Sequence, residues 1–584
     1  MSFPLRRAAR LPLAGLLLAS AACSGAPLAP PEPTGGDPKQ QYPYVPVPAP
    51  GDPGPADVRF EIDAAKPTPI SRFIYGMNAG AGWKGAKLPE GVTLLREGGN
   101  RYSAYNWETN ASNAGMDWYF TNDGYLGGGD VAGEAVRPTV ARAHGSGAAA
   151  LVTIPMLGHV AGDKSGPTGS DEAGLATRLA TRFKESRPRK GAAFSLRPDA
   201  GDRYVYQDEF VWWLNQTFPA AKSDPTRPIF YQLDNEPDLW HGTHEEVRSK
   251  VGGRANLLTY DDLVKRTIDY SAAIKDVAPG GVTFGGGFGT WSGAMNLGRW
   301  PTPDPVAGTA DFLDYFLGKM RDAEQAQGRR LLDVVDLHWY PEARGGGRRI
   351  TEDHTASTPG EAQARVQAPR SLWDPAYNEG SWVSDVLGGP IRLLPRLREK
   401  IAARYPGTKL AIMEYYYGGG ADVSGAIAQA DVLGIFGREG VFAAALWPLA
   451  NLAVHGGDPS RAYGYVFGGF RMFRDYDGRG GAFGDQGIPA ANSDAVKSSV
   501  YASLDSRDPG RVVVVAINKT GAPLRASIVL SHSRAFRTAE VYTLTSASPE
   551  PRRQADLALT HRNAVVYTMP AMSVTTLVLR ESAS

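Results

Sequence analysis

The chain has 584 residues, of which 42% are apolar and 21% are charged, so it has the ordinary balance of a globular protein. This length exceeds that of one typical domain and is enough for a large barrel with a smaller module. Lysine and arginine together number 62 and aspartate and glutamate 61, which gives a net charge of +1. A charge this close to zero gives no reason to expect nucleic acid or an anionic membrane surface as a partner.

The first 23 residues are predicted to be an export signal. Three arginines among the first ten residues precede LPLAGLLLASAA, an apolar run that is too short to cross a bilayer as a helix. Cys23, the only cysteine of the chain, follows directly, and the arrangement resembles a bacterial lipoprotein signal in which this cysteine is lipidated. Ser20 stands where a leucine is usual in such signals, so plain secretion is the alternative. We expect an exported protein, either a cell-surface lipoprotein or a secreted one.

Two short segments lead into the main fold. Residues 24–56 are too rich in proline and glycine to support a packed core, and they are predicted to be an extended linker. Residues 57–72 contain the run DVRFEID, which is predicted to be an N-terminal strand that joins a C-terminal β-sandwich.

Residues 73–490 are predicted to form a (β/α)8 barrel. Helix-length patterns, such as residues 260–277 and 391–405, separate short runs that are apolar on both faces, as expected of a covered parallel sheet. Eight such strands that alternate with helices indicate a (β/α)8 (TIM) barrel, an α/β fold. The predicted strands are residues 73–78, 92–99, 148–156, 229–237, 281–288, 334–341, 410–418 and 443–449.

Residues 491–584 have a different pattern. Six short runs rich in β-branched residues, such as RVVVVAIN and VTTLVLRE, are separated by turn-forming pieces such as NKTGAP. Little room is left for helices, so this region is predicted to be a small antiparallel β-sandwich domain.

Polar residues at the C-terminal ends of the predicted strands are the candidates for the active site, because barrel enzymes place their chemistry there. The fourth strand ends in Asn235 and Glu236, and the seventh ends in Glu414. Two carboxylates that face one barrel mouth meet the need of glycoside hydrolysis: one protonates the leaving oxygen, and the other attacks the anomeric carbon or activates water. Further polar and aromatic residues end other strands: Arg96, Glu97, Arg101, His338, Tyr340 and Trp447.

Each of these residues also has a purely structural interpretation. Glu236 could cap the following helix, Glu414 could belong to a buried ion pair, and His338 could be a hydrogen-bonded core histidine. The presence of two glutamates at the ends of strands four and seven favours catalysis. The neighbouring Asp234 and Asp238 are interpreted as supporting hydrogen-bonding groups, because one general acid is enough.

Motifs for other chemistries are incomplete. HGTH at 241–244 lacks the HExxH zinc pattern, and FGGGFGTW at 284–291 matches neither of the glycine-rich phosphate-binding patterns. The sequence contains no GxSxG motif and no arrangement for a reactive cysteine.

Four stretches carry a resemblance to a known family: REGGNRYSAYNWETNASNAGMDW (96–118), QLDNEPDLWHGTH (232–244), DLHWYP (336–341) and EYYYGGG (414–420). With them the chain resembles glycoside hydrolase family 44, the endoglucanases and xyloglucanases, from about Asp57 to the C-terminus. The resemblance implies a (β/α)8 barrel with a small β-sandwich and a retaining mechanism. It implies Glu236 as the acid/base and Glu414 as the nucleophile. It also implies that the cleaved sugar's subsite is lined by Arg96, Asn235 and Trp447.

Two positions depart from the family's pattern. Tyr416 stands where an asparagine usually follows the Glu-Tyr pair, and Glu97 stands where an apolar residue is common. Neither removes a catalytic group, and both are expected to alter subsite detail. No cofactor is required by this chemistry. Members of the family can also hold a structural calcium ion, whose ligands the sequence does not identify.

The sequence therefore predicts a monomeric endo-β-1,4-glucanase that acts on xyloglucan or other soluble β-glucans. Tyr340 and Arg96 are expected to orient Glu414, and His338 is a further candidate for substrate binding. The tryptophans expected to stack on sugar rings are Trp447, Trp107 and Trp240. Two alternatives remain: another retaining hydrolase, such as a xylanase or mannanase, and a surface lipoprotein that binds glycans without cleaving them.

Overall fold

The structure is a computed structural model that describes residues 48–79, 88–299, 304, 306, 311–449 and 452–581. These residues belong to one compact unit. The predicted export signal with Cys23, and all but the last residues of the predicted linker, lie outside the described residues. Within the described part, no helix combines the length and apolar character needed to span a bilayer.

Eight parallel strands close into a barrel in the order β12-β13-β14-β17-β18-β3-β4-β7. Seven of them lie within the predicted runs, and β17 begins one residue before its run, so the predicted (β/α)8 fold is confirmed. The strands are β3 (Gly76–Asn78), β4 (Leu94–Glu97), β7 (Ala149–Ile154), β12 (Ile229–Leu233), β13 (Thr283–Phe288), β14 (Val334–Trp339), β17 (Lys409–Tyr415) and β18 (Ala443–Leu446).

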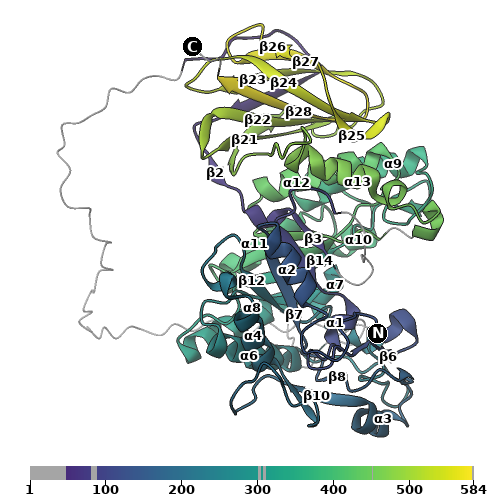
Figure 1. Cartoon of the computed structure of the whole chain (residues 1–584). Coiled ribbons are helices and arrows are strands. Elements are labelled where there is room, and N and C mark those ends of the chain that lie inside the picture. The colour runs from purple at the N-terminus through teal and green to yellow at the C-terminus, as the bar shows by residue number, and fades with distance from the viewer. Residues whose placement is uncertain are drawn as a thin grey trace, which may run out of the picture. The chain divides into compact units, whose positions relative to one another are not determined.

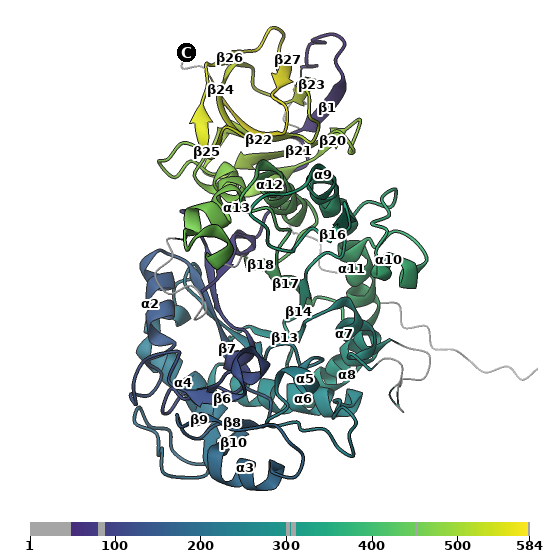
Figure 2. The same cartoon turned by 90° about the vertical axis from the view of Figure 1, so that its right-hand side faces the viewer.

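Helices lie outside the barrel strands, as α2, α8 and α11 do in Figure 2. In α6, Thr259 forms a capping box with Asp262, and buried residues then recur at helical spacing, from Leu263 to Ile274. The helices are α1 (Asn100–Ser103), α2 (Arg137–Gly145), α3 (Leu175–Arg182), α4 (Gln207–Thr217), α5 (Trp240–Thr243), α6 (Tyr260–Val277), α7 (Trp291–Asn296), α8 (Phe312–Gln327), α9 (Pro359–Gln367), α10 (Trp382–Leu387), α11 (Leu393–Arg404), α12 (Val423–Arg438) and α13 (Pro459–Arg474).

Small sheets are built into the loops that follow the barrel strands. One sheet joins β5 to β6 and β6 to β9, a second joins β8 to β10 and β10 to β11, and a hairpin pairs β15 with β16. Their bounds are β5 (Ser112–Asn113), β6 (Thr121–Asp123), β8 (His159–Ala161), β9 (Gly166–Pro167), β10 (Phe183–Arg187), β11 (Tyr204–Tyr206), β15 (Arg344–Gly345) and β16 (Arg348–Arg349).

The barrel interior is apolar at one end and polar at the other. Leu94, Phe230 and Val334 belong to a buried apolar cluster that fills the barrel. Side chains two residues further along a strand point the same way, and there the three strands carry Arg96, Gln232 and Asp336, all completely buried. The polar layer therefore lies at the C-terminal ends of the strands, directly under the barrel mouth.

A β-bulge in β17 turns Glu414 toward that mouth. From Asp336 to His338, β14 advances by two residues, whereas the paired positions on β17 advance from Ala411 to Glu414. Ala411 and Met413 face the barrel interior, so strict alternation would turn Glu414 outward. The extra residue re-aims the strand and brings the carboxylate back to the inside.

A β-sandwich follows the barrel in the chain (Figure 1). One sheet has the order β20-β1-β23-β27 and the other β2-β19-β21-β22-β28-β24-β25, with β26 paired to β24. Strand β1 pairs with β23 and β20, so residues from both ends of the described chain share one sheet. The strands are β1 (Val58–Asp63), β2 (Thr68–Pro69), β19 (Gln486–Ile488), β20 (Ala490–Asn492), β21 (Ser498–Asp505), β22 (Asp508–Asn518), β23 (Leu524–Ser531), β24 (Phe536–Thr545), β25 (Ser548–Arg553), β26 (Leu557–Ala558), β27 (Ala564–Met569) and β28 (Ser573–Glu581).

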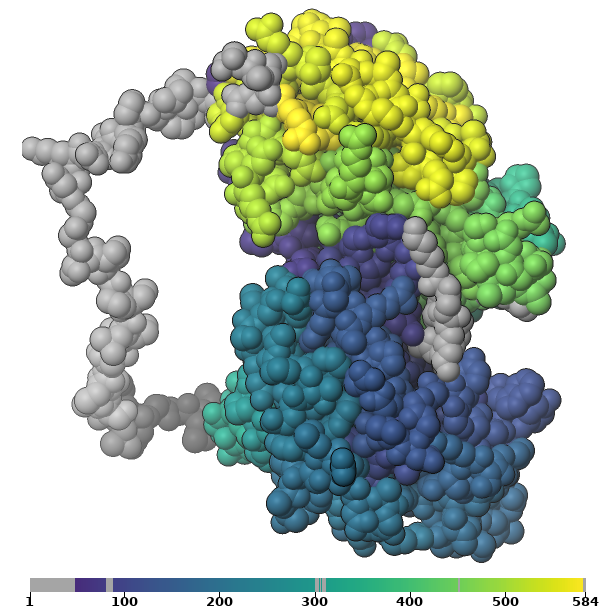
Figure 3. All heavy atoms as spheres, viewed as in Figure 1, coloured from purple at the N-terminus to yellow at the C-terminus, as the bar shows by residue number. Residues whose placement is uncertain are grey.

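Helices α12 and α13 form the contact between barrel and sandwich, and the space-filling view shows these regions in direct contact (Figure 3). Asp431 on α12 is bound by Lys519 at 2.7 Å and by the Tyr501 hydroxyl at 2.6 Å. Both charged side chains of this pair are 1% exposed. Removing one partner of such a buried pair destabilises a protein by several kcal/mol. The pair therefore helps to hold the barrel and the sandwich together.

Candidate active site

The residues after β12 form a strained turn that presents Glu236. Asp234 and Glu236 both have positive φ angles, of 65° and 45°, which L-residues rarely adopt. The Asp234 carboxylate accepts hydrogen bonds from the backbone N–H groups of Met156, Leu157 and Asn235, and the Glu236 N–H donates to the Gly287 carbonyl at 2.9 Å. Strain held by this many contacts is typical of a functional site.

The two flanking aspartates support this turn. Burial raises the pKa of Asp234 to about 6 and the pKa of Asp238 to about 7. The Asp238 carboxylate accepts the N–H of Gly289 at 3.0 Å, which fixes the loop after β13 beside the turn. Neither aspartate lines the cleft described below, in agreement with the supporting role expected of them.

Glu414 is held by a buried cation and a phenol. Arg96 Nη1 lies 2.5 Å from its Oε1, and the Tyr340 hydroxyl donates to its Oε2 at 2.7 Å. Burial raises the pKa of Glu414, but the positive charges of His338 and Arg96 outweigh this effect and hold the pKa below its ordinary value. Glu414 is therefore an ionised carboxylate at neutral pH, as a nucleophile must be.

The Arg96 side chain, on β4, connects its own strand to β3, β12 and β17. Besides Glu414, its guanidinium donates to Gln232 at 2.7 Å, to Asn78 at 2.8 Å and to Asn235 at 2.7 Å. The side chain is completely buried, so each of these bonds replaces one to water. A rigid guanidinium fork fixes the relative positions of its partners, which a flexible lysine would not do.

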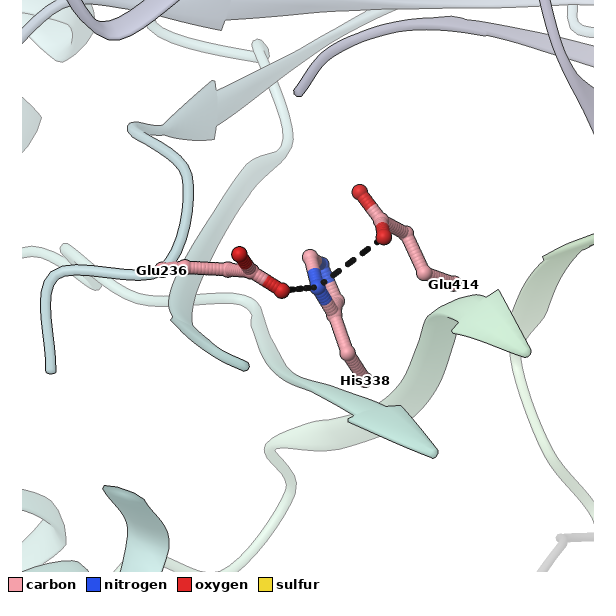
Figure 4. Close-up of side chains that lie close together, drawn as sticks. All are labelled: Glu236, His338 and Glu414. Atoms are coloured by element: carbon pink, nitrogen blue, oxygen red, sulfur yellow. Dashed lines mark hydrogen bonds and ion pairs between the residues drawn. The ribbon is translucent and has the colours of Figure 1, made fainter. Parts of the chain in front are cut away.

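His338 lies between the two glutamates (Figure 4). Its Nδ1 is 2.8 Å from Glu236 Oε1 and 3.4 Å from Glu414 Oε2. Burial lowers the pKa of His338, but the charge of Glu414 and the hydrogen bond to Glu236 outweigh burial and raise it. The imidazole thus fixes one oxygen of Glu236 inward and leaves the other free for a substrate.

The separation of the two carboxylates decides which reaction they can perform. Oxygens of Glu236 and Glu414 lie within 4.8 Å of each other. Inverting glycosidases hold their carboxyl groups about 6.5–9.5 Å apart to admit a water, whereas retaining enzymes hold them about 5–5.5 Å apart. The spacing fits direct attack by one carboxylate on the sugar.

An open cleft of about 760 Å³ lies over these groups. Glu236 is 15% exposed and Glu414 7%, so each carboxylate reaches solvent only through the cleft. Its walls are rich in aromatic rings and polar side chains, as expected for a site that binds sugars. They include Asn100, Arg101, Tyr102, Asp117, Trp118, Tyr125, Asn235, Tyr340 and Trp447.

Sequence relatives now identify the family. Residues 111–343 match the model of glycoside hydrolase family 44. The chain is 36% identical over 550 residues to endoglucanase A of Paenibacillus lautus, an alignment that covers 92% of this chain and 74% of that protein. This chain belongs to glycoside hydrolase family 44.

Solved structures agree with the membership in family 44. An endoglucanase of the family from Clostridium thermocellum is 36% identical with a TM-score of 0.81, over 90% of this chain and all of that one. A family 44 xyloglucanase from Paenibacillus polymyxa, solved with xyloglucan, is 35% identical with a TM-score of 0.82, over 90% of this chain and 100% of that chain. The protein is therefore a glycoside hydrolase with a (β/α)8 barrel.

The structure brings most of the predicted site residues of this family 44 chain together. Asn235, Glu236, Tyr340, Glu414 and Trp447 all line the cleft. Two other residues were predicted to bind substrate, but their side chains are completely buried beneath the carboxylates, so they orient the catalytic groups instead of touching sugar: Arg96 and His338.

The prediction that Trp107 and Trp240 stack on sugars is wrong, because both are completely buried. Trp107 stacks on Phe210 with ring centroids 5.3 Å apart, and its indole N–H donates to the Tyr206 carbonyl. The Trp240 indole N–H donates to the Asn235 carbonyl at 2.8 Å, so Trp240 supports the turn from behind. Neither ring has a face free for a ligand.

The two departures from the family pattern have different consequences. Tyr416 is buried and does not line the cleft. Glu97 is also buried, and it accepts a hydrogen bond from the hydroxyl of Tyr102, which does line the cleft. Glu97 therefore acts on the cleft through the position of Tyr102.

Cleft residues that sequence reasoning missed are concentrated in the loop after β4. Trp118 and Tyr125 line the cleft although the surrounding sequence, SNAGMDWYF, contains no regular pattern. Arg101 forms a bidentate pair with Asp123 and stacks on the Tyr125 ring at 4.4 Å, which fixes this wall. The sequence feature that could have identified these cleft residues is the high density of aromatic and amide residues in this loop.

A metal at this centre is disfavoured by its charge. Among the described residues, Glu236, His338 and Glu414 are the one group of three acidic or histidine side chains close enough to share an ion. The Arg96 guanidinium, 2.5 Å from Glu414, already supplies the positive charge that such an ion would bring. The structural calcium ion that the family resemblance implies stays a prediction without assigned ligands.

We expect the His338→Asn variant to lose part of the pH dependence of stability. Because folding raises the pKa of His338, its protonation stabilises the folded protein. This contribution is fully present below the ordinary histidine pKa of 6.5 and is lost as the pH rises through the raised pKa. Asparagine does not titrate, so the Tm of the variant falls less than that of the unmodified protein above about pH 6.5. Thermal melts between about pH 5 and pH 9 measure this, and parallel curves would contradict it. His244, the other buried histidine with a raised pKa, is present in both proteins.

Proposed function

We propose that this chain is a retaining endo-β-1,4-glucanase that hydrolyses β-glucans such as xyloglucan and soluble cellulose derivatives. The observation that carries the proposal is the pair of carboxylates, Glu236 and Glu414, within 4.8 Å of each other in an open cleft. The family relatives named as an endoglucanase and as a xyloglucanase bound to xyloglucan support this substrate class. An open cleft also suits attack within a long chain instead of at its end.

The first step forms a covalent intermediate. The ionised Glu414 attacks the anomeric carbon while the bond from that carbon to the glycosidic oxygen breaks. Glu236 donates its proton to the departing oxygen, so the leaving chain departs as an alcohol. The sugar is then bound as an ester to Glu414, and Glu236 is a carboxylate.

The second step releases the product. Glu236 takes a proton from water, whose oxygen attacks the anomeric carbon from the side that the leaving group vacated. The bond to Glu414 breaks, and both glutamates return to their starting forms. Two inversions at the same carbon give overall retention of configuration.

The surrounding residues prepare these groups. Arg96 and Tyr340 hold the two oxygens of Glu414, and His338 holds Glu236. Trp447 lines the cleft beside Arg96, where its ring can stack on the cleaved sugar. Asn235, which also lines the cleft, is fixed by Arg96 and offers its amide N–H group to a sugar hydroxyl.

The alternatives have less support. A binding protein without activity does not need a glutamate pair at catalytic spacing with a lowered pKa on one member, Glu414. A xylanase or mannanase would share the chemistry and differ only in the walls of the cleft.

A substrate screen tests the proposal. Reducing ends are measured after incubation with xyloglucan, carboxymethylcellulose, xylan and mannan, with the Glu236→Gln variant as the inactive control. We expect release from xyloglucan and carboxymethylcellulose, and much less from the other two polymers. Release from xylan or mannan alone would contradict the proposed substrate, and release from none would contradict the activity.

We further propose that the enzyme is exported as a monomer and anchored by a lipid on Cys23. The basic start, short apolar run and single cysteine support export and lipid attachment. If it holds, the Cys23→Ala variant leaves the membrane fraction of expressing cells. An unmodified protein found in the medium would favour plain secretion instead, and a variant that stays in the membrane fraction would contradict anchoring through Cys23.

A further inference from the structure

Two aromatic side chains project from the end of the 3-10 helix at Gly115–Trp118 and from the turn that follows it: Trp118 and Tyr119. Trp118 is 61% exposed and lines the catalytic cleft, whereas Tyr119 is 71% exposed and lies just beyond the cleft lining. Their ring centroids are 5.2 Å apart and their planes meet at 74°. The two rings therefore form a corner at the edge of the cleft.

The backbone of this turn is strained. Tyr119 and Phe120 have φ angles of 51° and 50°, a region that glycine and asparagine tolerate and that other residues adopt only at a cost in conformational energy. The ring of Tyr119 is mostly exposed to solvent, so it contributes little to the stability of the fold. A large exposed ring at a strained position suggests that the ring is retained for binding.

Several contacts nevertheless hold the turn rigidly. The Phe120 N–H donates to the Gly115 carbonyl at 2.9 Å, and the Phe120 carbonyl accepts from Asn113 and from Thr168. A Cβ at Gly115 would lie 2.2 Å from the Thr243 carbonyl oxygen, so the turn packs closely against the α5 region. A backbone held this firmly loses little conformational entropy when a ligand binds.

The turn is also tied to the cleft floor. The amide of Asn100 donates to both carboxylate oxygens of Asp117, at 3.1 and 3.2 Å. The same Asn100 side chain lies 3.5 Å from the amide of Asn235, the neighbour of the acid/base. A chain bound across the catalytic residues can therefore continue onto Trp118 without leaving the cleft.

We propose that Trp118 and Tyr119 form a corner that recognises a branched β-glucan, with a main-chain sugar on Trp118 and its sugar substituent on Tyr119. This inference rests on the proposed function. It assigns to Tyr119 the selection of branched over unbranched chains. Flat sugar faces stack on aromatic rings, and a substituent leaves the main chain at an angle that a single flat ring cannot follow. The corner is continuous with the cleft, so its occupant is the substrate and not a separate protein partner.

Tyr119→Asn is the sharpest test, because asparagine tolerates the left-handed backbone while removing the ring. We measure kcat/KM on a xyloglucan oligosaccharide and on an unbranched cello-oligosaccharide with the same main-chain length. The variant is expected to lose about three- to tenfold on the branched substrate and to keep its activity on the unbranched one. Tyr119→Phe, which keeps the ring, should behave like the unmodified enzyme on both.

Trp382→Ala is the matched control, because Trp382 is an exposed aromatic residue on α10 that does not line the cleft. It should leave both rates unchanged, and Tm should show that all variants are folded. Equal losses on both substrates, or no loss on either, would overturn the branch assignment. An unmodified protein that cleaves neither substrate would instead overturn the proposed function, so the two failures are distinguishable.

Discussion

Glu414→Gln is expected to lower kcat on β-glucans by at least about 10⁴-fold, because the amide cannot form the glycosyl ester on which both steps depend. Its size matches that of the glutamate, so Arg96 and Tyr340 keep a hydrogen-bonding partner and the fold is retained. Rates on xyloglucan and a thermal melt measure these two effects. Activity within tenfold of the unmodified enzyme would show that another group is the nucleophile.

Alanine variants of the two glutamates, assayed with added azide, distinguish the nucleophile from the acid/base by the anomer of the glycosyl azide that forms. In Glu414→Ala, azide occupies the vacated space and displaces the leaving group in a single inversion, which gives an α-glycosyl azide. In Glu236→Ala with an aryl glycoside, the ester on Glu414 still forms, and azide attacks it from the opposite side to give a β-glycosyl azide. The reverse pairing of products would mean that the roles are exchanged.

Arg96→Met is expected to lower the free energy of unfolding by about 3–5 kcal/mol, because it leaves the buried carboxylate of Glu414 without its cation. The variant also removes the donor to Gln232, Asn78 and Asn235. Arg96 holds the pKa of Glu414 down, so its loss raises that pKa and moves the acidic limb of kcat/KM to higher pH. Denaturation curves and pH–rate profiles measure the two effects.

Arg365→Met provides the matched control for this variant. Arg365 and its partner Glu361 are each 1% exposed and lie 2.6 Å apart, so the control also breaks a buried pair. It should destabilise the protein by a similar amount and leave the acidic limb of the pH–rate profile in place. A shift of the same size in both variants would mean that the effect of Arg96 on Glu414 is not specific.

The barrel could be predicted from the sequence because its strands are short apolar runs that stop at polar residues. Glu236 and Glu414 could be predicted in the same way, since each is a carboxylate near the C-terminal end of an apolar run, where packing gives it no role. The helix at Tyr260–Val277 matches the predicted residues, because its start carries a capping box and its interior keeps one apolar face.

Other features depend on contacts that sequence spacing does not reveal. The bulge in β17 decides that Glu414 points inward, and it is visible only in the pairing with β14. Trp107 and Trp118 stand in the same loop-rich region. Trp107 is buried because it stacks on Phe210, whereas Trp118 is 61% exposed. Likewise, Arg96 and His338 stand at strand ends but lie one layer below the cleft.

The central claim is that Glu236 and Glu414 cleave β-glucans by double displacement. Proton NMR recorded during the first minutes of hydrolysis, before mutarotation, identifies the anomer that forms first. We predict that the new reducing ends appear as the β-anomer and that the α-anomer grows in later. Initial appearance of the α-anomer would contradict the claim, because it would require a single displacement by water and carboxylates further apart than these two, whose oxygens lie within 4.8 Å of each other.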